Sequence, residues 1–263
     1  MIRIGYTLSM MRETGKKYPN WENIARVKEA GFDYVELPLN DLIALTRIEF
    51  DHILELLIKN DIRCETLNQA LPQGMRIVGH NINECAICDY LDRAEKVIHT
   101  LSAKRIIFGC AASKNLAEGE HRTMAIEQTV HFLQMFSDRL HPTHEIIAIE
   151  PINRLEANFI TNLKEAQELK LYTGRENIGI CADYFHMVTE HEPWEMLKNV
   201  ANSVVQLHFC QTDRGLPFYM DESMKEFIKM VKEIRYEKRM TLEANCFDPN
   251  ALQLSVEELR KYL

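Results

Sequence analysis

Four side chains that can bind a metal ion follow four apolar, strand-like runs in the second half of the chain. They are Glu150 after EIIAI, Asp183 after IGICA, His208 within VVQLHF and Glu243 after MTL. If parallel strands bring all four to one rim, three carboxylates and one imidazole meet there. This ligand set suits Mn²⁺, Mg²⁺ or Co²⁺ better than a metal that prefers thiolates. Each residue alone has a structural alternative, such as a capping acid, a core histidine or a surface charge, but four in succession favour a shared metal site.

Eight β-rich runs alternate with segments of helical periodicity along the whole chain. The runs are Ile2–Tyr6, Tyr34–Leu37, Ile62–Leu67, Arg105–Phe108, Ile146–Ile149, Ile178–Cys181, Val204–His208 and Met240–Leu242. Between them, apolar residues recur three and four positions apart, the spacing of a helix with one apolar face. Eight strand signals, each followed by a helix, predict an α/β protein: one (β/α)₈ TIM barrel, a single domain over residues 1–263. A doubly wound open sheet is the alternative, but no glycine-rich dinucleotide loop follows the first run.

Residues that typically begin or end helices lie where the predicted helical segments begin or end. Gly31 and Gly174 follow helical segments, where a left-handed cap is expected. Asn162, with Glu165 three positions later, predicts a capping box at the start of a helix. In a TIM barrel, residues at the carboxyl ends of the strands face the active-site rim. The four metal-competent residues end the fifth to eighth strands, which are neighbours in such a barrel, so we expect them to converge on one ion.

The composition limits the partners and the location of the protein. The chain has 263 residues, with 31 basic and 39 acidic side chains and a net charge of −8. An acidic chain without a basic cluster is a poor candidate for binding nucleic acid or an anionic membrane. Its start, MIRIGYTLSMMRE, is too polar for a signal peptide, and no apolar run approaches the ~20 residues that span a bilayer. Seven scattered cysteines suit a reducing compartment, and we expect a soluble, cytoplasmic protein.

Four motifs at the ends of the last four strands carry a resemblance to a known family. They read Glu150-Pro-Ile-Asn-Arg-Leu-Glu156, Asp183-Tyr-Phe-His186, His208 with Arg214 six positions later, and Glu243 alone. This set resembles the xylose-isomerase-like TIM-barrel sugar isomerases and epimerases. Within that family the chain is most similar to the ketose 3-epimerases of the tagatose and psicose group. The resemblance covers nearly the whole chain, but its specific motifs lie in the last four strands.

The resemblance implies a role for each matching residue. The metal ligands would be Glu150, Asp183, His208 and Glu243, with Mn²⁺ favoured over Mg²⁺ or Co²⁺. Glu150 and Glu243 would also be the acid/base pair, one taking the C3 proton of a ketose and the other returning it to the opposite face. A metal on O2 and O3 would stabilise the resulting enediolate. The residues that hold the hydroxyls at the carbonyl end of the sugar would be Glu156, His186 and Arg214.

Two loops depart from the pattern of the hexulose epimerases. The segment after the seventh strand, CQTDRGLPFYMDE, lacks a basic, glycine-rich run, and FGCAASKNLAEGE after the fourth lacks a tryptophan-containing lid. The substrate is therefore left as a ketose or a ketose phosphate. Lys114 is a candidate for a phosphate or carboxylate at the distal end, with a solvated loop lysine as the alternative. Tyr6 and Glu36 end the first two strands and are candidates for the pocket wall, with rim packing and a solvated loop acid as the alternatives.

The function predicted from these residues is a metal-dependent isomerase, specifically a ketose 3-epimerase. An aldose–ketose isomerase of the hydroxypyruvate-isomerase type is the nearest alternative, because it uses the same two glutamates. A dehydratase of the keto-inositol type and a non-catalytic sugar-binding barrel are the others. An endonuclease of the related barrels is disfavoured, because it needs more histidines for several zinc ions and a basic groove for phosphates. A homo-oligomer is left open.

Overall fold

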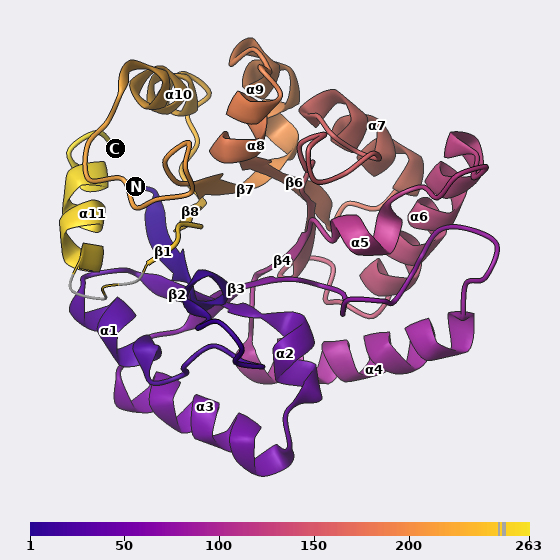
Figure 1. The fold of residues 1–263 in the computed structure, drawn as a ribbon, viewed down its shortest axis with the longest axis horizontal. Coiled ribbons are helices and arrows are strands. Elements are labelled where there is room, and N and C mark those ends of the chain that lie inside the picture. Colours follow the sequence, from indigo (N-terminus) through magenta and orange to yellow (C-terminus); the bar gives the residue numbers. More distant parts are fainter. Residues whose placement is uncertain (247, 249–250) are drawn as a thin grey trace.

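Within the described residues, 1–246, 248 and 251–263 of the computed structural model, eight parallel strands form one closed barrel. Each strand is paired with its neighbours in chain order, and β8 closes on β1 (Figure 1). The strands are β1 Arg3–Thr7, β2 Tyr34–Pro38, β3 Cys64–Asn68, β4 Arg105–Phe108, β5 Ile146–Ile149, β6 Ile178–Asp183, β7 Val204–Phe209 and β8 Arg239–Leu242. The predicted runs are confirmed, with ends shifted by about two residues at most, and the (β/α)₈ fold with them.

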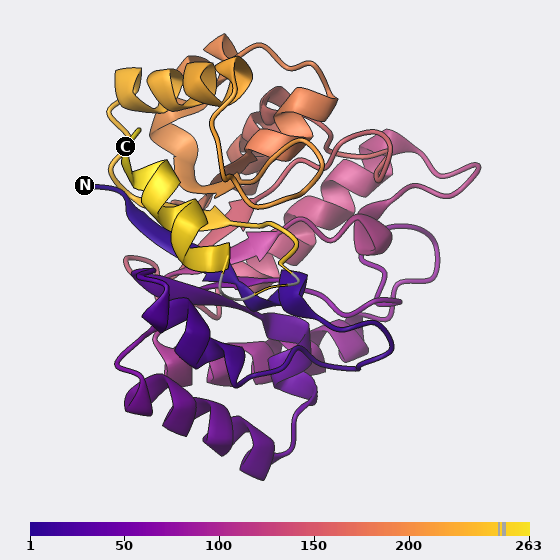
Figure 2. The same cartoon turned by 60° about the vertical axis from the view of Figure 1, so that its left-hand side comes forward.

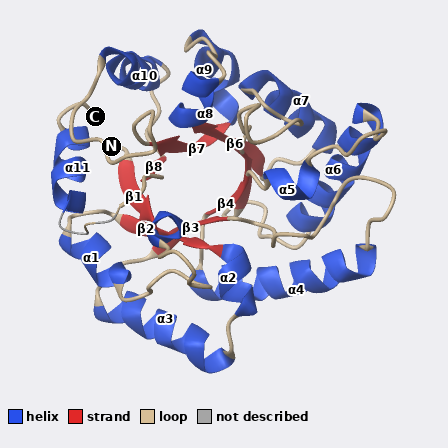
Figure 3. Ribbon diagram, viewed as in Figure 1, coloured by secondary structure: helices blue, strands red, loops and turns tan. Residues whose placement is uncertain are grey.

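Helices surround the barrel on its outside (Figure 3). They are α1 Asn23–Glu29, α2 Leu39–Ala44, α3 Arg47–Lys59, α4 Glu84–Leu101, α5 Ala111–Lys114, α6 Arg122–Ser137, α7 Leu163–Thr173, α8 Tyr184–Thr189, α9 Glu195–Val200, α10 Glu222–Glu233 and α11 Ala251–Arg260, with 3-10 turns η1 Leu8–Met11 and η2 Ala201–Ser203. The C-terminal helix α11 lies beside β1, so the two ends of the chain come close together (Figure 2). Among the described residues, no helix is both long enough and apolar enough to cross a bilayer.

The predicted helix boundaries follow local backbone chemistry. Gly31 and Gly174 both adopt positive φ, at 93° and 61°, as a left-handed cap requires. Asn162 caps α7, because its side-chain oxygen accepts from the Glu165 amide at 3.0 Å. The reciprocal half of the predicted capping box differs: the Glu165 carboxylate accepts from the Thr161 amide at 2.8 Å. That carboxylate also pairs with Arg122 at 2.7 Å, which accounts for its displacement from a standard box.

Candidate functional site

The four predicted metal ligands converge at the carboxyl-terminal mouth of the barrel. One ligand atom from each of the four, Glu150, Asp183, His208 and Glu243, lies within 4.8 Å of the others. The His208 Nδ1 atom is 2.7 Å from a Glu150 oxygen and 3.3 Å from a Glu243 oxygen. They meet because β5 to β8 are consecutive strands of the barrel, and each residue lies within the last two positions of its strand or directly follows it. The predicted convergence is confirmed, whereas metal binding itself stays a prediction.

Two orphaned polar atoms show that these residues fit a cation. Asp183 uses one carboxylate oxygen to cap α8, accepting from the Phe185 amide at 2.6 Å. Its other oxygen and the Nδ1 of His208 are buried, and neither has a hydrogen-bond partner of good geometry among the described residues. Buried polar atoms without partners are rare in folded proteins. A divalent cation bound by three carboxylates and one imidazole would give both atoms a partner.

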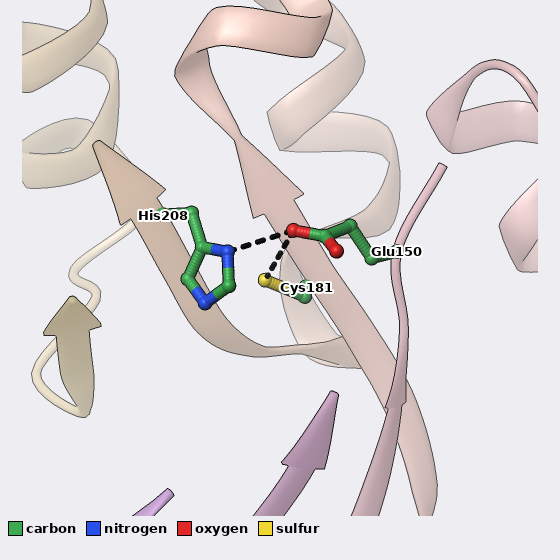
Figure 4. A group of neighbouring side chains, drawn as sticks. All are labelled: Glu150, Cys181 and His208. Carbon is green, nitrogen blue, oxygen red and sulfur yellow. Dashed lines mark hydrogen bonds and ion pairs between the residues drawn. The ribbon is translucent and has the colours of Figure 1, made fainter. Parts of the chain in front are cut away.

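A cysteine sulfur lies against the same site but is not suited to bind the ion. Cys181 and His208 approach one oxygen of Glu150 (Figure 4), and the thiol donates to that oxygen at 3.7 Å. Burial raises the pKa of the Cys181 thiol well above its ordinary value. Because the thiolate is the form that binds metals, the cluster that contains Asp183 and Glu243 is the better cation site.

The charge of His208 depends on the carboxylates around it. Burial alone lowers the pKa of this imidazole, but Cys181 and three carboxylates raise it well above the ordinary histidine value. Those carboxylates are Glu36, Glu150 and Glu243. These carboxylates therefore favour a positive charge at His208, and a cation bound at Nδ1 would take the place of a proton.

The predicted carbonyl-end residues lie beside the metal cluster. The Arg214 guanidinium pairs with Glu156 at 2.9 Å and lies 3.9 Å from Glu243. It also stacks on the Phe185 ring, 4.0 Å from the ring centroid. His186 lies 3.6 Å from the free oxygen of Asp183, through its Nε2. A cavity of about 390 Å³ is lined by five of the predicted site residues, namely Glu150, Glu156, His186, Arg214 and Glu243.

Two residues predicted to contact substrate do not line this cavity in the described part of the chain. Tyr6 is wholly buried, and its hydroxyl donates to the Ala244 carbonyl at 2.6 Å. Lys114 is also wholly buried, with its ammonium donating to the Gly109 carbonyl. Burial lowers the pKa of Lys114 to about 8, against the opposing influence of Cys110 and Glu150. The solvated-lysine alternative is wrong, because the Lys114 side chain has no exposed surface and its ammonium is bonded to a backbone carbonyl.

The far wall of the cavity consists of residues that the sequence did not single out. They come from the end of β3 and from the segments after β1 to β4, and include Arg12, Asn40, Asn68, Gln69, Gln73 and Ser113. Asn68 ends β3 as Asp183 ends β6, so the same strand-end signal could have found it. The others are isolated polar residues in loops and short helices, where no periodic pattern distinguishes them. Glu36 lies inside the barrel with no exposed surface, so the alternative of a solvated loop acid is wrong.

Comparison with known proteins finds similar TIM barrels, among them sugar epimerases. Residues 24–262 match the family model described as xylose isomerase-like TIM barrel. A probable ketose 3-epimerase from Synechocystis sp. is 23% identical over 120 residues, which span 45% of this chain and only 42% of that relative. The D-allulose 3-epimerase from Methylomonas sp., solved with D-allulose, superimposes with a TM-score of 0.84 at 17% identity, covering 100% of this chain and 97% of its own.

A second solved structure extends this likeness beyond the 3-epimerases. The 3-keto-D-glucoside 4-epimerase from E. coli superimposes with a TM-score of 0.81 at 17% identity. The superposition covers 99% of this chain and 100% of the other. At such identities the likeness to both structures establishes the shared barrel fold alone, so the chemistry must be argued from the site.

Proposed function

The chain belongs to the xylose isomerase-like TIM-barrel family, and on that premise we propose that it is a divalent-metal-dependent epimerase acting at C3 of a ketose. One observation carries the proposal: Glu150 and Glu243 reach the same cavity from the ends of two different strands, at 2.7 Å and 3.3 Å from His208 Nδ1. Epimerisation needs two such groups, because a single base returns the proton to the face it came from. The similarity to a probable ketose 3-epimerase supports this choice.

Each side chain has a distinct part in the proposed reaction. When bound, a divalent cation supplies Lewis-acid stabilisation of negative charge on the sugar oxygens. Glu150 and Glu243 exchange the C3 proton from opposite faces, one as base and the other as acid. Arg214 and His186 lie beside them in the cavity wall, where their donors can stabilise charge that develops on O2. Glu156 holds the Arg214 guanidinium through its 2.9 Å ion pair and so orients it toward the sugar.

The competing reactions differ in where the proton goes. An isomerase of the hydroxypyruvate-isomerase type would return it to the carbon next to the one it left. The cluster of Glu156, His186 and Arg214 beside the two acids favours the epimerase. Both proposed acid/base residues are in place, which argues against a barrel that only binds sugar. Mn²⁺ as the metal and the cytoplasm as the location stay predictions.

Proton exchange in deuterated water tests the proposal. The protein is incubated with Mn²⁺ and a panel of free and phosphorylated ketoses, and the products are followed by NMR. An epimerase incorporates deuterium at C3 and forms the C3 epimer. Incorporation at C1 of the recovered ketose and at C2 of an aldose product would instead identify an isomerase. Metal-saturated protein that exchanges no sugar proton with any member of the panel would contradict a catalytic role. Protein stripped with a chelator is the control.

A further inference from the structure

A carboxylate is buried inside the barrel directly behind the metal cluster. Glu36, on β2, has no exposed surface, and its Oε2 atom lies 3.3 Å from the Nε2 of His208 on β7. The same oxygen accepts from the hydroxyls of Thr66 at 2.8 Å and Thr241 at 3.1 Å. Burying an ionised carboxylate is costly unless charged or hydrogen-bonding groups compensate it. Because burying Glu36 costs free energy, we look for a functional reason for its position.

The surroundings of Glu36 hold it in one position. The Thr241 hydroxyl lies 2.8 Å from the Tyr34 hydroxyl and accepts from the Gln206 amide at 2.8 Å. Among the described residues, the hydrogen-bonding partners of Glu36 are the neutral hydroxyls of Thr66 and Thr241 and the imidazole of His208. These contacts hold the Oε2 atom of Glu36 so that it faces the Nε2 side of the ring.

The two ring nitrogens of His208 face different groups, Glu36 on one side and the proposed metal site on the other. Nε2 donates its proton to Glu36, which leaves Nδ1 as the nitrogen directed toward Glu150 and Glu243. A carboxylate on the far nitrogen fixes the tautomer and the orientation of a metal-binding histidine and increases its basicity. We propose that Glu36 is a positioning residue of the metal centre, holding His208 with the Nδ1 lone pair aimed at the cation. This inference rests on the proposed metal dependence.

The test compares two isosteric substitutions in the same buried layer. Glu36→Gln keeps the size of the side chain but removes the charge that fixes the tautomer. Its Mn²⁺ affinity, measured by titration calorimetry on metal-stripped protein, should fall about 10- to 100-fold. Tyr34→Phe is the matched control, because Tyr34 bonds Thr241 and Gln206 and, among the described residues, has no hydrogen bond to Glu36 or His208. It should lower the melting temperature of the metal-free protein while its Mn²⁺ affinity stays within about twofold of wild type.

A second variant, Thr66→Val, keeps the proposal testable if Glu36→Gln does not fold. Thr66→Val removes one of the two hydroxyls that hold Glu36 and leaves the carboxylate in place. It should weaken Mn²⁺ binding a few-fold. Two results would overturn the role of Glu36 alone: wild-type affinity in Glu36→Gln, or an equal loss in Tyr34→Phe. Wild-type protein that binds no divalent cation would overturn the proposed function as well, so the two failures are distinguishable.

Discussion

The two glutamates of the proposed acid/base pair have different neighbours. Glu150 accepts from the Cys181 thiol, whereas Glu243 lies 3.9 Å from the Arg214 guanidinium. Both are mostly buried, with 8% and 15% of the side chain exposed. The two proposed acid/base residues therefore have different surroundings within the same cavity.

Replacing either glutamate separates proton removal from epimerisation. Glu150→Gln and Glu243→Gln should each reduce epimer formation by at least about 10³-fold, because one face loses its proton-transfer group. Where the metal still binds, one variant should exchange the C3 proton only from the epimer that its remaining carboxylate reaches. NMR in deuterated water measures both quantities. Near wild-type epimerisation by either variant would disprove the two-base mechanism.

The space beside Glu150 depends on a glycine. A Cβ atom added at Gly109 would lie 2.5 Å from a Glu150 carboxylate oxygen and 3.1 Å from Ile152. Gly109 is not among the residues with positive φ, so alanine fits its backbone. Gly109→Ala should therefore displace Glu150 and lower kcat about 10²-fold, since small misplacements at a reacting group are costly. The melting temperature should change by only a few degrees, and an unchanged kcat would show that Glu150 has freedom to move.

At the scale of elements, the loops after β5 and β7 are joined across the cavity. Arg214 adopts a left-handed backbone, φ 60°, and its carbonyl accepts from the Asn245 amide at 2.7 Å. Its side chain pairs with Glu156 in the loop after β5. These contacts hold the guanidinium at the cavity wall, where it also lies 3.9 Å from Glu243, one of the four proposed metal ligands.

Removing the guanidinium should affect the sugar more than the metal. Arg214→Ala should raise KM and lower kcat, with a combined loss of about 10²-fold or more in kcat/KM, because a charged donor beside O2 is lost. Mn²⁺ affinity should stay close to wild type. Steady-state kinetics and calorimetry measure the two effects. A variant that instead loses its metal would show that the loop, not the sugar contact, is the function of Arg214.

The carboxylate of Glu192, which contacts the start of helix α7, makes the stability of the protein depend on pH. Glu192 accepts from the Leu163 amide at 2.9 Å at the start of α7. Burial, together with the nearby Glu190 and Glu165, raises the pKa of Glu192 from 4.5 to about 7, against the opposing influence of the Leu163 hydrogen bond. Between pH 4.5 and about pH 7, Glu192 is therefore protonated in the folded protein and ionised in the unfolded chain. The contribution of Glu192 to stability falls as the pH rises from about 4.5 to about 7.

Glu192→Gln should remove this pH dependence. The amide oxygen still accepts from Leu163 but carries no charge to bury. The variant should be more stable than wild type at pH 8, by about 2 kcal/mol, and equally stable at pH 4. Urea unfolding at both pH values measures the difference. Glu192→Ala is the control, because it loses the acceptor as well and should give no such gain. An equal effect of Glu192→Gln at both pH values would contradict the shifted pKa.

At the scale of the whole molecule, the proposed cation connects the strands of the second half of the barrel. Its four ligands come from β5 to β8 or directly follow them. A ligand that binds only the folded state stabilises it by about 2.7 kcal/mol at a hundredfold excess over Kd. For a protein of this size we expect Mn²⁺ to raise Tm by about 5–10 °C at that excess. Scanning calorimetry with and without a chelator measures the shift, and an unchanged Tm would count against the metal site.

The sequence alone determined the barrel and the group of metal-competent residues. Both signals are local: β-rich runs such as Ile146–Ile149 are defined by adjacent residues, and Asp183 is marked by the run that precedes it. Once eight parallel strands close in order, residues at equivalent strand ends must meet at one rim. Long, strongly patterned elements therefore predicted both the fold and the position of the site.

The tertiary structure alone decided which isolated polar residues support that site. Glu36 and His208 are 172 positions apart, and nothing in the sequence near either one indicates that they share a hydrogen bond. Lys114 looks like a loop lysine in the sequence, but its side chain has no exposed surface and its ammonium is bonded to the Gly109 carbonyl. The burial and partners of such side chains depend on which strands and loops pack together, a property of contacts between distant residues that no local pattern records.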